Sequence, residues 1–203
     1  MIRAFLAVEL PDELRAELAT VQQELKRKIE PEMKRNTRIA WARPASIHLT
    51  MKFLGDMDEQ VADPLLAAVE QAIGSLMAVN VPLERLGAFP LPQSPRVLWV
   101  GPSESWERGA EARRVAEIHG AIEQACEGLG FHRETRPFSP HLTLARIRVG
   151  ERHIGVALAK GGVLDRTLSL GALAVDSVVL MKSELRPTGS VYTKLWDVRL
   201  NGT

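Results

Sequence analysis

Two spacings of apolar residues divide the chain into predicted helices and strands. Apolar residues recur every three or four positions through 12–29, about 58–77 and roughly 105–129, as expected for helices with one buried face. Shorter apolar and β-branched runs predict strands at 2–10, 47–54, 81–89, 97–100, 138–149, 168–173, 177–181 and 191–200. A short helix, a polar loop and a turn are expected at 151–160, 31–40 and 187–189. Strand pairs joined by helices, without a regular βαβα alternation, predict an α+β fold with antiparallel sheets covered by helices on one face.

Two eight-residue segments of the chain have nearly the same sequence. RPASIHLT at 43–50 returns 93 residues later as RPFSPHLT at 136–143, and the copies share Arg, Pro, Ser, His, Leu and Thr. A period of this length is too long for a solenoid unit and matches a duplicated half-domain. The repeat therefore predicts two similar lobes, each carrying one copy of the repeated segment on a strand.

The His-x-Thr part of each copy predicts a polar pair on one face of its strand. Side chains alternate between the two faces of a strand, so His48 and Thr50 share one face while Leu49 lies on the other. His141 and Thr143 repeat this arrangement. A duplicated strand copies structural residues as well, but packing alone does not require an imidazole and a hydroxyl in both copies. We therefore interpret the four polar residues as a functional set.

Two imidazoles suit a reaction that moves two protons. Histidine has an unperturbed pKa of about 6.5, so near neutral pH one ring can act as a base while its partner acts as an acid. Cleavage of a phosphodiester by water needs such a pair, one to activate the water and one to protonate the leaving oxygen. The hydroxyl groups of Thr50 and Thr143 can donate to the charged phosphate oxygens.

Rival chemistries lack their motifs in this sequence. The HExxH and CxxC spacings of zinc sites are absent, as are GxSxG and the phosphate loop GxxxxGK[ST]. Metal-free acid–base catalysis is therefore favoured. The formal net charge of +1 provides no strong overall positive field, so binding of nucleic acid needs a local site. The single Cys126 excludes an internal disulfide.

No segment predicts membrane insertion or export. No apolar run approaches the ~18 residues of a membrane span. The start, MIRAFLAVELPDE, has a short apolar run that soon meets acidic residues and lacks a basic n-region with a small-residue cleavage site. We interpret it as a strand of the mature protein and expect a cytoplasmic location.

Several segments together resemble a known family. Two HxTx motifs separated by about 90 residues are similar to those of the 2H phosphoesterases. Within that superfamily, the chain resembles the RNA 2′,3′-cyclic phosphodiesterases, once called 2′–5′ RNA ligases. The segments that carry this resemblance are IRAFLAVELPDEL, WARPASIHLTMKFLG, PRVLWVG, RPFSPHLTLAR and SELRPTGSVYTKL. They extend from Ile2 to about Leu195.

The resemblance implies a single bilobed domain over 1–203, with duplicated halves and HxTx motifs at 48–51 and 141–144. Two antiparallel sheets flanked by helices would be related by a pseudo-twofold axis, with a central cleft between them. The implied activity is hydrolysis of an RNA terminal 2′,3′-cyclic phosphate to a 2′-phosphomonoester, without a metal or any other cofactor.

The resemblance also assigns roles to individual residues. His48 would be the proton donor and His141 the proton acceptor, while Thr50 and Thr143 would hold phosphate oxygens. Arg146 completes HLTLAR and would assist the phosphate. Strict alternation sends Arg146 to the face opposite His141, so this role requires a bulge or a strand end that turns the arginine back.

Three further residues are candidates for substrate binding. Lys52 has the same parity as His48 and could meet the RNA backbone, although a solvated lysine fits equally well. Phe53 and Tyr192 could stack on a base, but aromatic residues more often pack in a core.

Two alternative functions stay open from the sequence alone. The same residues would serve a reversible 2′–5′ RNA ligase that joins RNA halves, and a non-catalytic protein that binds RNA ends or nucleotides would also keep them. The expected partners are RNA with a 2′,3′-cyclic phosphate end or cyclic nucleotides, with no membrane and no metal, and we expect a monomer.

Overall fold

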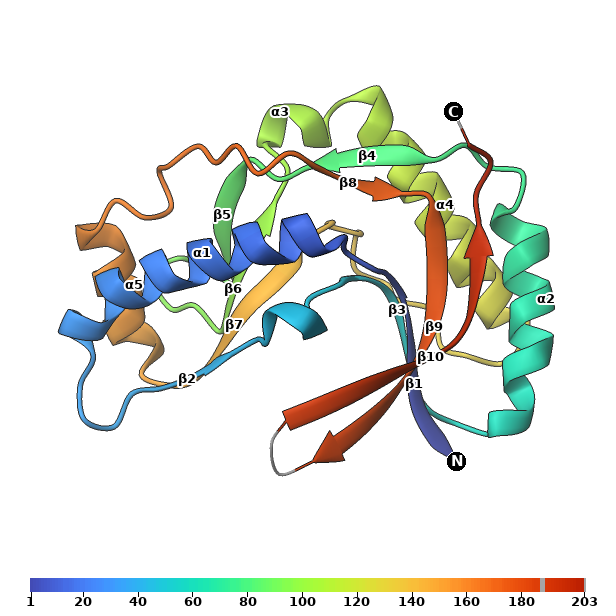
Figure 1. The fold of residues 1–203 in the computed structure, drawn as a ribbon, viewed down its shortest axis with the longest axis horizontal. Coiled ribbons are helices and arrows are strands. Elements are labelled where there is room, and N and C mark those ends of the chain that lie inside the picture. The colour runs from blue at the N-terminus through green and yellow to red at the C-terminus, as the bar shows by residue number, and fades with distance from the viewer. Residues whose placement is uncertain (187–188, 203) are drawn as a thin grey trace.

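The computed structural model describes residues 1–186 and 189–202 (Figure 1). The strands are β1 (Ile2–Val8), β2 (Arg38–Trp41), β3 (Leu49–Met57), β4 (Val79–Pro82), β5 (Arg85–Phe89), β6 (Val97–Gly101), β7 (Leu142–Val149), β8 (Ala172–Val175), β9 (Ser177–Arg186) and β10 (Gly189–Arg199). The α-helices are α1 (Asp12–Ile29), α2 (Ala62–Ile73), α3 (Glu104–Glu107), α4 (Ala110–Glu127) and α5 (Glu151–Lys160). The turn predicted at 187–189 lies largely outside the described residues.

Strands from both halves of the chain join in one large antiparallel sheet. Its strand order is β10-β9-β1-β3-β7-β6-β5, with β2 also paired to β7, while β4 and β8 form a second sheet. β3 and β7 meet at the residue pair Leu49 and Leu142. The strands on either side of this pair repeat each other, because β1 flanks β3 as β6 flanks β7. The predicted α+β fold, with two antiparallel sheets and helices, is therefore confirmed.

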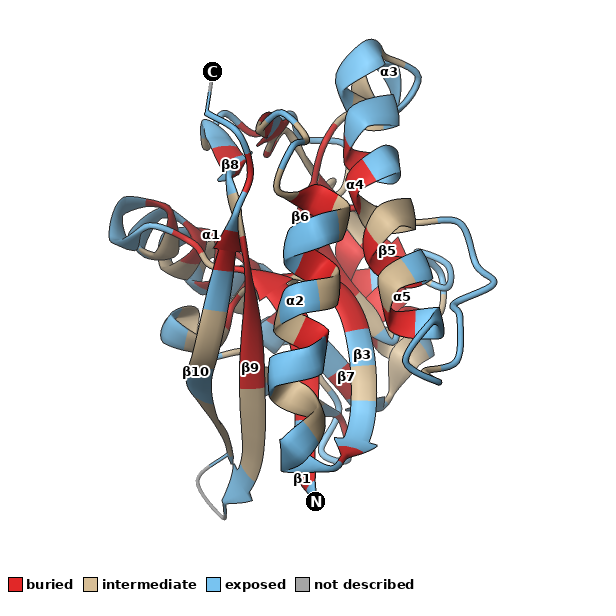
Figure 2. Ribbon diagram, turned by 90° about the vertical axis from the view of Figure 1, so that its right-hand side faces the viewer, coloured by how far each residue is buried: buried red, intermediate tan, exposed pale blue. Residues whose placement is uncertain are grey.

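Each motif strand is covered by a helix from the other half of the chain. α4, which precedes β7, packs against β3 and α2. α1, which precedes β3, reaches β7 through Gln22, whose Nε2 donates to the carbonyl oxygens of Ala42 and Leu144 at 2.8 Å each. Figure 2 shows the exposed residues of α2 on its outer side. The leucines of both motifs, Leu49 and Leu142, are buried beneath these helices.

Several predicted segments differ from the structure, and the strand expected at 168–173 begins only at Ala172 as β8. The helix expected at 105–129 divides into α3 and α4, because Gly109 adopts extended backbone between them. The strand expected at 81–89 divides into β4 and β5, which pair in different sheets. The segment 31–40, expected to be a loop, contains most of β2, whose short alternation becomes a strand by pairing with β7. Within residues 1–186 and 189–202, each helix is too short or too polar to cross a membrane.

Candidate active site

The two motif histidines are oriented in the same way. Nδ1 of His48 lies 2.9 Å from the carbonyl oxygen of Ser46, and Nδ1 of His141 lies 2.8 Å from that of Ser139. A carbonyl oxygen only accepts, so Nδ1 carries the proton in both rings. Nε2 is therefore left, in each ring, as the nitrogen that can take up or give away a proton.

The pair Leu49–Leu142 fixes how the two motifs face each other. Side chains alternate along each strand, so both histidines and both threonines lie next to this pair, on the face opposite its leucines. All four polar residues are partly buried. The topology thus gathers both His-x-Thr pairs on one face of the sheet.

A bulge in β7 returns Arg146 to the face of His141. Leu98 of β6 pairs with Ala145, whereas the next residue, Trp99, pairs with Thr143, so Leu144 is an extra residue in β7. The side chains of Leu144 and Ala145 then both point into the core, and beyond them the alternation of side chains resumes with the two faces exchanged. Leu144 and Ala145 are fully buried, and Arg146 is exposed. The bulge that the sequence interpretation required is present.

A matching bulge in β3 exchanges the faces of Lys52 and Phe53. Leu6 of β1 pairs with Lys52, and Ala7 pairs with Thr50, so the residue between them is extra. Lys52 therefore points into the interior and Phe53 takes the face of the first motif. The side chain of Phe53 is 68% exposed. Phe53 stands 93 residues before Arg146, so the two bulges occupy equivalent places in the repeat.

Lys52 is an interior residue, which contradicts its predicted contact with RNA. Its Nζ lies 2.7 Å from Oε2 of Glu123 in α4 and 2.8 Å from the carbonyl oxygen of His132. Both charged side chains are only 3% exposed. Glu123 also accepts the backbone N–H of Glu134 at 3.0 Å. This ion pair ties the strand of the first motif to the loop that leads into the second.

Aromatic rings stand against both histidines. The ring of Phe5 stacks on His48 with centroids 4.6 Å apart, and Tyr192 meets the same imidazole edge-on at 5.4 Å. On the other lobe, Phe89 meets His141 edge-on at 5.0 Å. Tyr192 thus lies beside the first motif histidine. Phe53 extends the first group, since its ring lies 6.3 Å from that of Phe5.

The sequence interpretation missed three residues of this region. Phe5 and Phe89 lie on strands whose partners only the fold reveals, so no local pattern marked them. Glu123 did leave a signal, because it directly follows Ile122 on the buried stripe of its helix and is itself buried. An acidic residue in such a place needs a buried cationic partner.

Burial lowers the pKa of both motif histidines. Desolvation is the main cause for His48 and brings its pKa to about 4; the Ser46 carbonyl opposes the shift and the charge of Arg146 adds to it. The pKa of His141 is lowered by the same causes, with Ser139 in the opposing role. One guanidinium therefore acts on both rings. Near pH 7 the free protein presents two neutral imidazoles beside one cation, an arrangement suited to an anion.

Comparison with known proteins identifies the family. A family profile described as LigT like Phosphoesterase matches residues 8–99 and 109–192. A protein of Aeropyrum pernix named RNA 2′,3′-cyclic phosphodiesterase is 33% identical over 156 residues, which are 76% of this chain and 82% of the relative. A protein of the same name from Methanothermobacter thermautotrophicus is 29% identical over 98% of this chain and 99% of its own.

A solved structure agrees with this match. The crystal structure of the protein TT0787 from Thermus thermophilus superposes with a TM-score of 0.68 at 28% identity and covers 99% of both chains. Profile, relatives and fold thus span nearly the whole sequence. The chain belongs to the LigT-like phosphoesterase family.

Proposed function

We propose that this protein hydrolyses the 2′,3′-cyclic phosphate at an RNA end to a 2′-phosphomonoester. The observation that carries the proposal is the pair of imidazoles with free Nε2 atoms on one face of the sheet, both under the influence of Arg146. The name shared by its relatives, RNA 2′,3′-cyclic phosphodiesterase, supports this substrate.

In the proposed reaction each histidine handles one proton. Nε2 of His141 removes a proton from water, and the water oxygen bonds to phosphorus. The bond from phosphorus to the 3′ oxygen breaks, and Nε2–H of His48 protonates that oxygen. Thr50, Thr143 and Arg146 bind the remaining phosphate oxygens and stabilise the charge that builds on them. One water is consumed: one of its protons passes to His141 and then to solvent, the other stays on the new phosphate hydroxyl, and His48 regains a proton from solvent.

The lowered pKa of His48 fits an acid that becomes protonated when substrate binds. Arg146 depresses the pKa of both imidazoles in the free protein. A phosphate bound there offsets the guanidinium charge and places its own negative charge beside the rings. Both changes favour the imidazolium form. Tyr192, which meets His48 edge-on, and Phe53, which lies near Phe5, are proposed to contact the terminal base.

Product analysis tests the proposed activity. A 2′,3′-cyclic nucleotide incubated with the protein is expected to give only the 2′-phosphomonoester, and phosphorus NMR distinguishes this product from the 3′ isomer. EDTA is expected to leave the rate unchanged. Strong inhibition by the chelator, or an unchanged substrate, contradicts the proposal. A joined 2′–5′ product from mixed RNA halves would instead favour the ligase.

The pH dependence should reflect the lowered pKa values. An acid loses activity as pH rises through its pKa, and a base loses activity as pH falls through its pKa. Because both pKa values lie below 6.5, we expect the optimum of kcat/KM, which reports the free enzyme, below pH 6.5. The Arg146→Met variant should move this optimum to higher pH and lower kcat, because it removes a charge that depresses both pKa values.

Two controls sharpen the pH experiment. Arg146→Lys keeps the positive charge, so its histidine pKa values should stay near those of the native protein. Titration of the histidine C2–H resonances by NMR measures the shifts without catalysis. Histidine pKa values that do not rise in Arg146→Met would show that the guanidinium does not act on the rings.

A further inference from the structure

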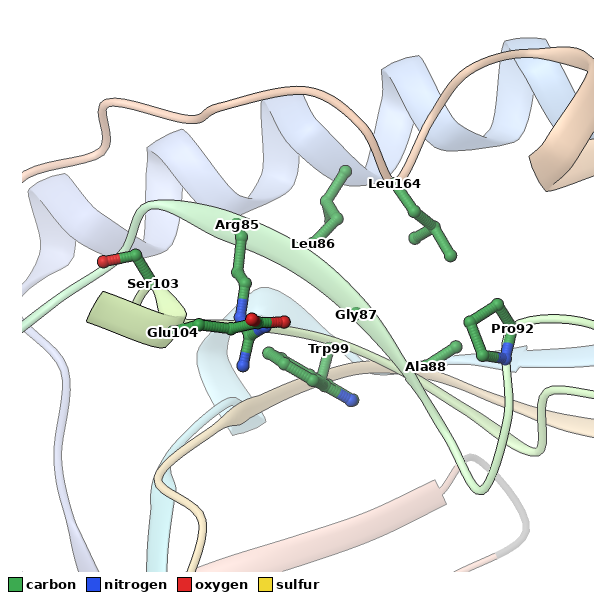
Figure 3. A pocket seen from close by; sticks show the side chains of 9 residues that line it. All are labelled: Arg85, Leu86, Gly87, Ala88, Pro92, Trp99, Ser103, Glu104 and Leu164. Atoms are coloured by element: carbon green, nitrogen blue, oxygen red, sulfur yellow. The ribbon is translucent and has the colours of Figure 1, made fainter. Parts of the chain in front are cut away.

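A pocket of ≈ 400 Å³ opens beside the aromatic residues that flank His141 (Figure 3). β5, at the edge of the large sheet, forms one wall, and Pro92 and Leu164 form others. Arg85 and the indole of Trp99 also line the pocket. The pocket therefore combines apolar surface, an aromatic ring and one guanidinium.

Trp99 belongs both to this pocket and to the surroundings of His141. Its ring centroid lies 6.2 Å from that of His141, and Phe89 stacks on it at 5.0 Å. Gly87 allows this position, since a Cβ there would collide with the indole. The Trp99 indole is thus shared between the pocket lining and the surroundings of His141.

Two donors at the pocket wall have no partner among the described residues. Nε1 of Trp99, a residue only 5% exposed, is buried without a hydrogen bond, and so is Nε of Arg85. Figure 3 shows the indole nitrogen at the end of the ring away from Arg85 and Glu104. A buried donor without an acceptor is costly. A ligand with acceptor atoms would satisfy them.

The charges around Arg85 select a neutral ligand over a phosphate. Its Nη1 lies 3.0 Å from a carboxylate oxygen of Glu104, and its Nη2 lies 2.8 Å from one of Glu107. Two carboxylates on one guanidinium leave a local negative balance, which repels phosphate. The guanidinium also lies over the Trp99 ring, 5.2 Å from its centroid. Flat, neutral groups with acceptor atoms suit such a site, and nucleobases have these properties.

We propose that this pocket binds the base of the penultimate nucleotide, the one that precedes the nucleotide carrying the cyclic phosphate. The inference rests on the proposed function, which places the terminal phosphate at His141. The next nucleotide of the strand then lies within reach of the pocket behind Trp99. The base packs between Leu164 and the indole, beside the end of the ring that carries the unpaired Nε1.

The test compares two substrates in the same protein sample. A dinucleotide with a terminal 2′,3′-cyclic phosphate is expected to have a kcat/KM about tenfold above that of the cyclic mononucleotide, as one stacked base contributes. Leu164→Trp fills the pocket and should bring this ratio close to one. Arg85→Met, which removes one donor and the guanidinium, should lower the ratio as well and serves if Leu164→Trp does not fold.

Matched controls separate the possible results. Leu91→Trp places the same bulk at an exposed position outside the pocket lining and should keep the native ratio. A dinucleotide whose 5′ nucleotide is abasic should behave like the mononucleotide. A native ratio of one, or a ratio that the pocket variants or the abasic substrate leave unchanged, overturns the inference. Failure to hydrolyse the mononucleotide would instead refute the proposed function itself.

Discussion

Replacement of His48 or His141 by alanine is expected to lower kcat by about 10²–10⁴, the span of one acid–base partner. Each variant removes the Nε2 that handles one of the two protons, while both threonines and Arg146 stay in place to bind the phosphate. KM is therefore expected to change much less than kcat. Steady-state kinetics with a cyclic nucleotide measure both parameters.

A third histidine provides the control for these variants. The side chain of His132 is exposed, and its backbone carbonyl, rather than its ring, accepts from Lys52. His132→Ala should therefore keep kcat. Turnover by His48→Ala or His141→Ala near the native rate would refute the assignment of the two motif histidines. A double variant should lose little more than either single one, because the two residues act as a unit.

Breaking the buried ion pair should produce the largest loss of stability. Lys52→Met leaves the Glu123 carboxylate buried without its cationic partner, and one of its oxygens, Oε1, already lacks a hydrogen bond among the described residues. We expect the free energy of unfolding to fall by about 3–5 kcal/mol. Urea denaturation followed by circular dichroism measures the change.

The double variant Lys52→Met/Glu123→Leu distinguishes the cost of an unpaired buried carboxylate from the loss of the ion pair itself. Two apolar side chains of similar volume are often neutral or stabilising in place of a buried ion pair, so most of the lost stability should return. The N–H of Glu134 then lacks its acceptor, which offsets part of this gain. The exposed pair Lys160–Glu32 is the control, since Lys160→Met should cost at most about 1 kcal/mol. A single variant as stable as the double would contradict the expected cost of the unpaired carboxylate.

The sequence contained enough to predict the fold class and the two polar His-x-Thr pairs. Helical spacing located α1 and α2, and the repeat of His-x-Thr indicated two polar pairs on matching strands. Both inferences depend on local periodicity, which the chain carries in its own letters. They needed no knowledge of which strands lie side by side.

The inferences that failed depend on pairing between distant strands. Parity along β3 placed Lys52 beside His48, but the extra residue Met51 exchanges the faces, and only the register with β1 reveals it. The equivalent extra residue in β7 had the opposite outcome, because it brings Arg146 to the site. Single-sequence patterns do not show where a neighbouring strand skips a residue. They also missed β2, whose pairing with β7 defines it.

Because each half of the chain supplies a helix that packs on the motif strand of the other, the stabilities of the two halves are coupled. α4 covers the strand of the first motif, and Gln22 of α1 holds the strand of the second. Loosening either half therefore exposes the apolar side of the other, so neither constitutes an autonomous folding unit. The protein should melt in one cooperative transition, and His48 and His141 should lose their native positions in that same transition.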